Sequence, residues 1–196
     1  MDRPTPIAVA ICGIAFIVIA FLAGPAFSPS EFSWLRHTVS EQASQSLDGA
    51  WIMRLGFVAY GFCTSYAAFL DRHTRPNIRY VLMVFGMGLI ATAVWSNASI
   101  MPNFDSDLRE DWIHSIASGI VGTAFASACA LRIFAPFGST RDVLAWIGLL
   151  ASIAIPFAMN QVPDYQGLLQ RAMFLISFAF VIREFSDTGR SSGVRH

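Results

Sequence analysis

The stretch PIAVAICGIAFIVIAFLAG, at residues 6–24, is 19 residues long and contains no charged side chain. A helix that crosses the hydrocarbon core of a bilayer needs about 20 mostly apolar residues. The stretch therefore predicts a transmembrane helix.

Five further stretches of similar length and apolar character follow. They are residues 51–70, 80–100, 112–135, 143–160 and 166–184. Over the whole chain 55% of the residues are hydrophobic and 13% are charged, whereas an ordinary globular domain has about 25% charged residues. The sequence predicts an all-α polytopic membrane protein, with one domain of six transmembrane helices over residues 1–185. The polar residues 186–196 are expected to form a disordered cytoplasmic tail.

Charge distribution predicts the orientation of these helices. All 13 basic residues are arginines, and nine of them lie at the N-terminus or after an even-numbered stretch. Because cytoplasmic loops carry an excess of basic residues, we expect a multi-pass protein of the cell membrane with both termini in the cytoplasm. The outer side carries eight acidic residues against four arginines. The arginines are scattered rather than clustered, so the pattern does not indicate nucleic-acid binding.

The first outer loop, residues 25–50, contains a helix-start pattern of its own. Ser28-Pro29-Ser30-Glu31 fits a capping box, with a serine at the N-cap, a proline at the first helical position and a glutamate three residues after the cap. A helix is expected to run from there to about Gln45. Its residues form an apolar stripe and a polar side, so the sequence predicts a short amphipathic helix at the membrane interface.

The fourth stretch carries two rows of small residues at a spacing of four. The rows are Ser115/Gly119/Thr123/Ser127 and Ser118/Gly122/Ala126/Ala130. Small residues let helix backbones approach closely in lipid. The sequence therefore predicts that this helix is the packing centre of the bundle.

Histidines and carboxylates recur where polar segments are expected to meet at the outer membrane boundary. His37 and Glu41 are four residues apart in the loop, and Asp111 and His114 are three apart where the fourth span begins. Imidazole and carboxylate groups can bind zinc or exchange protons near neutral pH. His37, His114 and Asp111 are thus candidate ligands of a divalent metal such as zinc. The alternative is structural, because acids also complement the dipole of a first helical turn.

Two arginines lie inside predicted spans rather than at their ends. Arg54 is about two turns into the second span, and Arg171 lies one to two turns into the sixth. A buried arginine is costly in lipid unless it finds a partner. One interpretation is an ion-pair network with nearby acids. The other is that Arg54 and Arg171, together with Asp111 and His37, form a binding site for an anionic group.

The segments His37-Thr38-Val39-Ser40-Glu41, Asp111 to His114 and Gly167-Leu168-Leu169-Gln170-Arg171 together resemble the domain-of-unknown-function 998 family of small prokaryotic membrane proteins. The resemblance spans nearly the whole chain. It implies about six spans, and it marks Ser40, Glu41, His114 and Arg171 as site positions. Gln42-Ala43 departs from the Leu-Gly that is commoner in the family at this point. The family brings no established activity.

Three functional hypotheses remain open. The first is a membrane protein whose outward polar pocket binds a lipid head group or a small anion. The second is a metal-dependent hydrolase or transferase that acts on lipid, in which Ser40, Glu41 and His114 are candidate catalytic residues. The third is a structural or assembly subunit that pairs with itself or with another membrane protein. The expected partner of the first two is membrane lipid.

Overall fold

The computed structural model describes residues 4–71, 75–134 and 139–186. Within these ranges the chain is helical and has no strand. The long helices are α1 (Pro6–Ala23), α3 (Ala50–Leu70), α4 (Pro76–Val94), α5 (Leu108–Phe134), α6 (Val143–Gln161) and α7 (Gln166–Ser186). The short ones are η1 (Gly24–Phe27), α2 (Val39–Gln42) and η2 (Pro163–Tyr165). The all-α prediction is confirmed, and most of the predicted tail lies outside the described residues.

Helix starts follow from residues that the sequence places there. Pro6 and Pro76 occupy the first positions of α1 and α4, where the missing N–H of proline costs nothing and its fixed φ suits a helix. Asp142 precedes α6, and its side chain accepts a hydrogen bond from the Ala145 N–H at 3.0 Å. The first N–H groups of a helix have no partner within it. Each of these helices therefore begins where such an N–H is either missing, as in proline, or hydrogen-bonded to a side chain.

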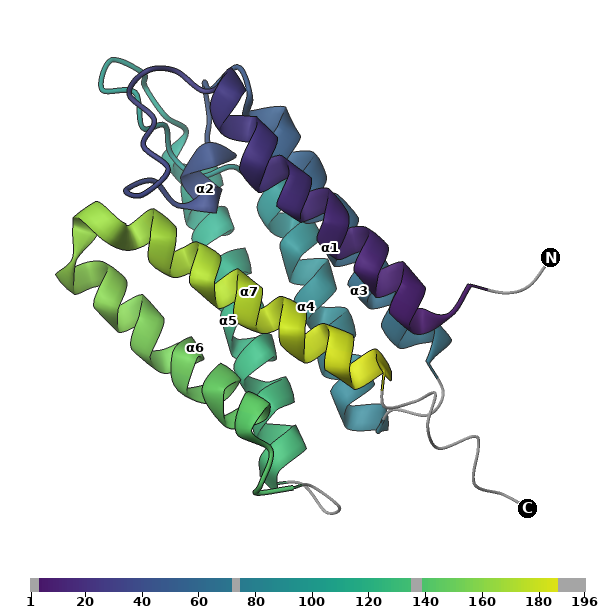
Figure 1. Ribbon diagram of the computed structural model, residues 1–196. Coiled ribbons are helices and arrows are strands. Elements are labelled where there is room, and N and C mark those ends of the chain that lie inside the picture. The colour runs from purple at the N-terminus through teal and green to yellow at the C-terminus, as the bar shows by residue number, and fades with distance from the viewer. Residues whose placement is uncertain (1–3, 72–74, 135–138, 187–196) are drawn as a thin grey trace, which may run out of the picture.

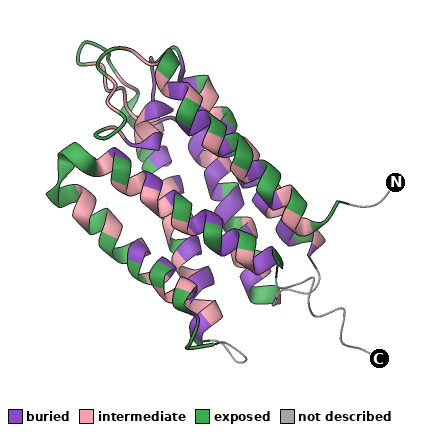
Figure 2. Ribbon diagram, viewed as in Figure 1, coloured by how far each residue is buried: buried purple, intermediate pink, exposed green. Residues whose placement is uncertain are grey.

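The long helices form a closed ring. Each packs against the next one in the chain, and α7 packs back against α1 (Figure 1). The first loop and the link between α4 and α5 lie together at one end of the bundle, which we call the loop end. Helix α1 starts and α7 stops at the opposite end, which we call the terminal end. Buried residues line the inner faces of the helices, and exposed apolar residues run along their outward faces (Figure 2).

An aromatic cluster fills the centre of the ring. The Phe174 ring of α7 lies 5.5 Å from Phe21 and 6.1 Å from Phe57, centroid to centroid. Phe178 makes a T-shaped contact with Tyr60 at 5.0 Å. Such pairs add stabilisation beyond the area that they bury. They attach α7 to both α1 and α3.

The apolar helices make this a membrane protein. Among the residues that the structure describes, five segments are long and apolar enough to cross a bilayer, namely Pro6–Phe27, Pro76–Val94, Leu108–Phe134, Val143–Gln161 and Pro163–Ser186. Helix α3 has 21 residues, which is also sufficient length at 1.5 Å per residue. It contains Arg54 and is not among the five. The predicted count of six spans therefore stays a prediction.

The first loop contains a short helix, but the predicted bounds, from Ser28 to about Gln45, are wrong. Ser28 follows η1, and its hydroxyl donates to the Gly24 carbonyl at 3.1 Å. The α-helix of this loop is the four-residue α2. It has a true capping box, built by Thr38 and Glu41, ten residues later than predicted. The physical reason is a contact with α7. A continuous loop helix would use the carbonyls of Leu35 and Arg36 for its own hydrogen bonds, but here they accept from N–H groups in the first turn of α7.

The prediction that the fourth span is the packing centre is also wrong. Gly119 and Gly122 of α5 have no heavy atom within 4 Å of the position that a Cβ would occupy. A close helix contact is found instead between α3 and α4, where a Cβ on Gly61 would overlap the carbonyl oxygen of Gly86. Gly119, Thr123 and Ser127 of α5 border open space.

Candidate functional site

Arg171 is the central cation of the loop end. Its side chain enters from the second turn of α7, and the residue is 3% exposed. One guanidinium nitrogen, Nη1, donates to the carbonyls of Trp34 and His37 at 2.9 Å each, and Nη2 donates to Gln42 Oε1 at 3.0 Å. The guanidinium carbon also lies 4.5 Å from the centre of the Trp34 ring. The guanidinium charge is thus stabilised by neutral hydrogen-bond acceptors and an aromatic face rather than by a carboxylate in contact.

The first turn of α7 holds the same loop by its backbone. The N–H groups of Gly167 and Leu168 donate to the carbonyls of Arg36 and Leu35 at 3.0 and 3.1 Å. Gly167 is required here, because a Cβ would lie 2.6 Å from the Trp34 carbonyl oxygen. Orphan donors at a helix N-terminus normally need a cap. In this protein the first loop supplies it.

Helix α2 connects α7 to the rest of the bundle. Gln42, which is buried, accepts from Arg171 and donates through Nε2 to the Ala20 carbonyl of α1 at 3.1 Å. Arg54 of α3 donates to the carbonyls of Ala43 and Ser44 at 3.0 and 3.2 Å. A cation at the C-terminus of a helix opposes the negative end of its dipole. Arg54 therefore serves α2 as a C-terminal cap.

The predicted acid Glu41 is part of this short helix. Its Oε2 accepts from the Thr38 N–H at 2.7 Å, and its own N–H donates to the Thr38 hydroxyl at 3.1 Å. Ser40 lies beside it and is half-buried. These contacts give Glu41 a capping role. The catalytic role that the hydrolase or transferase hypothesis gives to Ser40 and Glu41 stays a prediction.

His37 lies in the turn that Arg171 binds, and its ring accepts a hydrogen bond. The Ser33 N–H donates to Nδ1 at 2.8 Å, so Nδ1 carries no proton in this arrangement. Burial lowers the pKa of His37 below its ordinary value, Glu41 raises it, and Arg36 and Arg171 lower it further. His37 is thus held neutral. The ring stays 5.5 Å from that of Phe32.

Asp111 and Glu110 bind the link between α4 and α5. Asp111 Oδ1 accepts from the Ala98 N–H, and Glu110 Oε1 accepts from the Ser96 N–H, each at 2.7 Å. Both acids lie in the first turn of α5, where negative charge is favoured by the helix dipole. Both residues are half-buried, and their carboxylates are directed at backbone N–H groups.

His114 lies one turn deeper and is 2% exposed. Its Nδ1 is 2.8 Å from the Trp95 carbonyl, so Nδ1 is the protonated nitrogen of the neutral ring. The opposite nitrogen, Nε2, is buried and has no hydrogen-bond partner among the described residues. This is the orientation in which a histidine can act as a ligand or base. One such histidine does not make a metal site.

The structure divides the predicted site residues into two groups. His37, Glu41 and Arg171 gather around α2, whereas Asp111 and His114 hold the end of α4. Gln45 connects the groups, since it donates through Nε2 to the Ser96 and Asp107 carbonyls and accepts from the Asp107 N–H. Across the part of the chain that the structure describes, no three histidine, cysteine or carboxylate side chains gather as metal ligands. The predicted zinc and its ligands stay a prediction.

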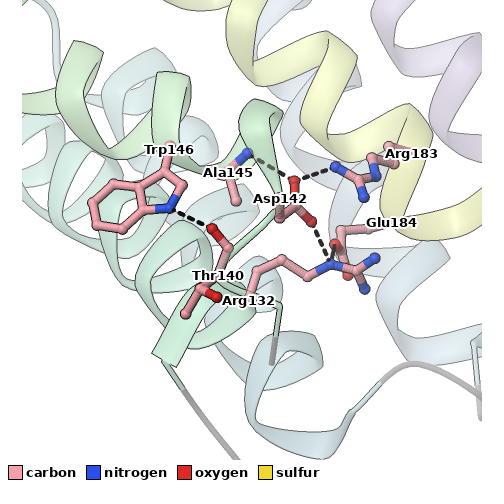
Figure 3. Close-up of polar contacts among 7 residues, drawn as sticks. All are labelled: Arg132, Thr140, Asp142, Ala145, Trp146, Arg183 and Glu184. Atoms are coloured by element: carbon pink, nitrogen blue, oxygen red, sulfur yellow. Dashed lines mark hydrogen bonds and ion pairs between the residues drawn. The ribbon is translucent and has the colours of Figure 1, made fainter. Parts of the chain in front are cut away.

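A second polar cluster at the terminal end was not predicted. Buried Asp142 receives hydrogen bonds from Arg132 Nε at 2.9 Å and from Arg183 (Figure 3). Glu184 Oε1 lies 3.4 Å from Arg132 Nε. The network ties the end of α5 and the start of α6 to the last turn of α7. Burial raises the pKa of Asp142, but the hydrogen bonds from both arginines and Ala145 together lower it.

A sequence signal for this cluster existed. The basic side of the membrane carries a few acids among its arginines, including Asp142 and Glu184, and Glu184 lies at the end of the sixth predicted span. An ionisable residue in a span normally has a partner. The arginines of this side therefore carry two signals, one for the orientation of the chain and one for ion pairs with these acids.

A groove runs along the outward side of α4 and α5. It has a volume of about 440 Å³ and is lined mainly by apolar and small side chains. The lining residues are Val81, Val84, Ile116, Gly119, Ile120, Thr123, Ala124 and Ser127. Four of these lining residues, at positions 116, 119, 120 and 123, lie on the same face of α5 as Trp112. Trp112 is one turn nearer the loop end and is 65% exposed. The groove thus begins in the third turn of α5, one turn beyond Trp112, and continues along the middle of α5 toward the terminal end.

Comparison with known proteins gives one match. A family described as protein of unknown function (DUF998) matches residues 9–183. No curated protein and no solved structure matches the chain.

Proposed function

The chain belongs to the DUF998 family of proteins of unknown function, and we propose that this membrane protein binds an anionic membrane lipid. The observation that carries the proposal is the groove of about 440 Å³ between α4 and α5. Its apolar lining suits an acyl chain. Pockets of this size commonly hold small ligands.

The face of α5 above the groove supplies a head-group site. Arg109, Trp112 and Ile116 are spaced by three and four residues, so they lie on one helix face with Gly119 and Thr123 below them. Trp112 is placed as tryptophan usually is at a membrane–water interface. A phosphate at the level of Arg109 would leave an acyl chain at the level of Gly119, where no side chain fills the space.

Charge supports an anionic head group. The neighbouring acids Glu110 and Asp111 are engaged by backbone N–H groups of the α4–α5 link. The backbone of Arg109 donates to Asp107 Oδ1 at 2.8 Å, while no described residue pairs with its exposed guanidinium. An arginine can bind a phosphate through two parallel hydrogen bonds.

Arg109 is a better head-group ligand than the two arginines that the sequence favoured. The guanidinium N–H groups of Arg171 and Arg54 donate to backbone carbonyls and to Gln42. An anion would have to displace those contacts, and unpaired buried carbonyls are costly. The proposal therefore keeps the predicted ligand class but assigns it to another arginine.

The orientation is part of the proposal. With nine of 13 arginines on the side of the termini, the positive-inside rule puts the loop end outside the cell membrane and both termini in the cytoplasm. A cysteine introduced at Ser30 should react with a membrane-impermeant thiol reagent in intact cells. A cysteine introduced at Thr140 should react only after lysis. The reverse pattern would invert the orientation.

The binding proposal is tested with purified protein in detergent. Native mass spectrometry after addition of phosphatidylglycerol should show a saturable lipid adduct. Arg109→Gln should weaken its binding about fivefold, because one arginine near an anionic surface contributes about 1 kcal/mol. Gly119→Leu should abolish the adduct by filling the groove.

Arg36→Gln is the matched control, because Arg36 is an exposed arginine of the loop end that pairs with Asp164 at 2.8 Å. Its lipid binding should equal that of the wild type. Equal binding by all four proteins would overturn the proposal, provided that each elutes as a folded species.

A further inference from the structure

A second pocket opens at the loop end, away from the α4–α5 groove. It has a volume of about 240 Å³ and lies between the end of η1, the residues that precede α3 and the α4–α5 link. Its walls include Phe27, Ser28, Ser46, Asp48 and Met101. The pocket is too small for a lipid but is of the size of a small head group.

The walls of this pocket are held in place by the polypeptide. Ser46 has a positive φ of 66°, which is uncommon for a residue other than glycine. Its hydroxyl lies 2.5 Å from that of Ser99. On the other side Gly49 is pressed against Phe27, since a Cβ there would lie 2.6 Å from the Phe27 carbonyl oxygen. The pocket is therefore preformed rather than created by loose loops.

Its chemistry is that of a site for an organic cation. Asp48 is exposed, and no described residue pairs with its carboxylate. The ring of Phe27 is 58% exposed, and Met101 contributes a polarisable thioether. A carboxylate attracts a positive charge, an aromatic face stabilises alkylated ammonium groups, and methionine sulfur adapts to methyl groups.

Four other acids of the loop end are already engaged. Asp164 pairs with Arg36 at 2.8 Å, and Glu41, Glu110 and Asp111 accept from backbone N–H groups. Asp48 differs from these acids because its carboxylate lines a cavity and has aromatic and sulfur groups around it. The combination, rather than the acidity of the surface, indicates a ligand.

We propose that the Asp48 pocket binds an alkylammonium group. The group could belong to a soluble amine such as choline or to the head group of a zwitterionic lipid, and both present the same chemistry. This inference is independent of the α4–α5 groove, because the two sites share no residue.

The test uses choline chloride as the probe and the full-length protein in nanodiscs of phosphatidylglycerol, which has no ammonium group. Titration calorimetry should show saturable binding. Asp48→Asn should weaken it tenfold or more, since it removes the charge and keeps the shape. Phe27→Leu should weaken it about two- to fivefold, which corresponds to a cation–π contribution at an exposed site.

Asp105→Asn is the control, because Asp105 is an exposed acid of the same end that does not line the pocket. Its affinity for choline should be unchanged. Equal affinity of wild type and Asp48→Asn, or no saturable binding by a folded wild-type protein, would overturn the inference. Thermal unfolding of each variant would show whether the fold is retained.

A second arm identifies the source of the ammonium group. The choline titration is repeated in nanodiscs of phosphatidylcholine. A weaker apparent affinity there supports the site and assigns it to a lipid head group, because the lipid competes. The same affinity in both nanodiscs supports the site and assigns it to a soluble amine.

Discussion

The Arg171 guanidinium lies over the Trp34 ring at 4.5 Å and donates to the Trp34 carbonyl at 2.9 Å. One residue of the loop thus supplies both a π face and a dipole to a cation that is buried in a membrane helix. Isolated arginines in a membrane are costly. The loop end satisfies this one by bending its backbone onto the start of α7.

Arg171→Lys should destabilise the protein despite keeping the charge. An ammonium cannot reach Trp34, His37 and Gln42 with the spread of a guanidinium, so carbonyl groups are left buried without donors. We expect a loss of about 2–4 kcal/mol, seen as a lower midpoint of thermal unfolding in detergent.

The control for this variant is Arg36→Lys. Arg36 also bridges the loop and the η2–α7 region, but its side chain and that of Asp164 are mostly exposed. Exposed ion pairs contribute about 0–1 kcal/mol, so its midpoint should barely change. A similar midpoint for Arg171→Lys and the wild type would contradict the anchoring role.

The sequence predicts the helices well and the loop end poorly, and the reason is physical. Helix positions follow from long apolar runs and from prolines such as Pro6 and Pro76, which act locally. The helix predicted over residues 28–45 does not form as such, because carbonyls of this segment accept hydrogen bonds from Gly167, Leu168 and Arg171. These donors lie more than a hundred residues later in the chain. No local pattern carries that information.

The site residues show the same limit. Arg171, Asp111 and His114 lie at one end of the bundle, which follows from the depth of their segments in the predicted spans, and their role as a site stays a prediction. Which partner each one takes depends on loop geometry, and in the structure Arg171, Asp111 and His114 all contact backbone groups. Arg109 and Asp48 lie outside the predicted spans 112–135 and 51–70, so the cost of a charge in lipid does not mark them in the sequence.

His37 should titrate below its ordinary pKa of 6.5. Burial disfavours the charged ring, and protonation of Nδ1 would break the hydrogen bond from Ser33. Because the folded pKa is lowered, the stabilisation is present above about pH 6.5 and is lost as the pH falls. NMR titration of the imidazole measures it, and His37→Asn should remove that part of the pH dependence. A pKa at or above 6.5 would contradict the neutral assignment.

Asp142→Asn tests the terminal-end network separately from helix capping. Asparagine caps helices about as well as aspartate, so the bond from the Ala145 N–H is retained while the charge that Arg132 and Arg183 share is removed. Removing one partner of a buried pair costs about 3 kcal/mol or more, and denaturant unfolding at pH 7 should show a loss of that order.

The pH dependence gives this variant its control. The pKa of Asp142 is lowered below its ordinary 3.8, so the wild-type advantage should be constant above about pH 5 and should shrink as the pH falls through the folded pKa. A difference between wild type and Asp142→Asn that persists unchanged at pH 3 would assign the effect to shape and not to charge.

Two glycines of neighbouring helices should respond oppositely to alanine. Gly86 of α4 faces Gly61 and Ser65 of α3 so closely that a Cβ would overlap both the Gly61 carbonyl and the Ser65 hydroxyl. Gly122 of α5 has no heavy atom within 4 Å of that position and borders a small void of about 30 Å³.

Gly86→Ala must push α3 and α4 apart, and overpacking typically costs about 1–3 kcal/mol. Gly122→Ala fills open space and gains up to about 1 kcal/mol of helix propensity. Thermal unfolding of both variants in one detergent decides the point, because a lower midpoint for Gly122→Ala than for Gly86→Ala would place the close helix contact on α5 rather than between α3 and α4.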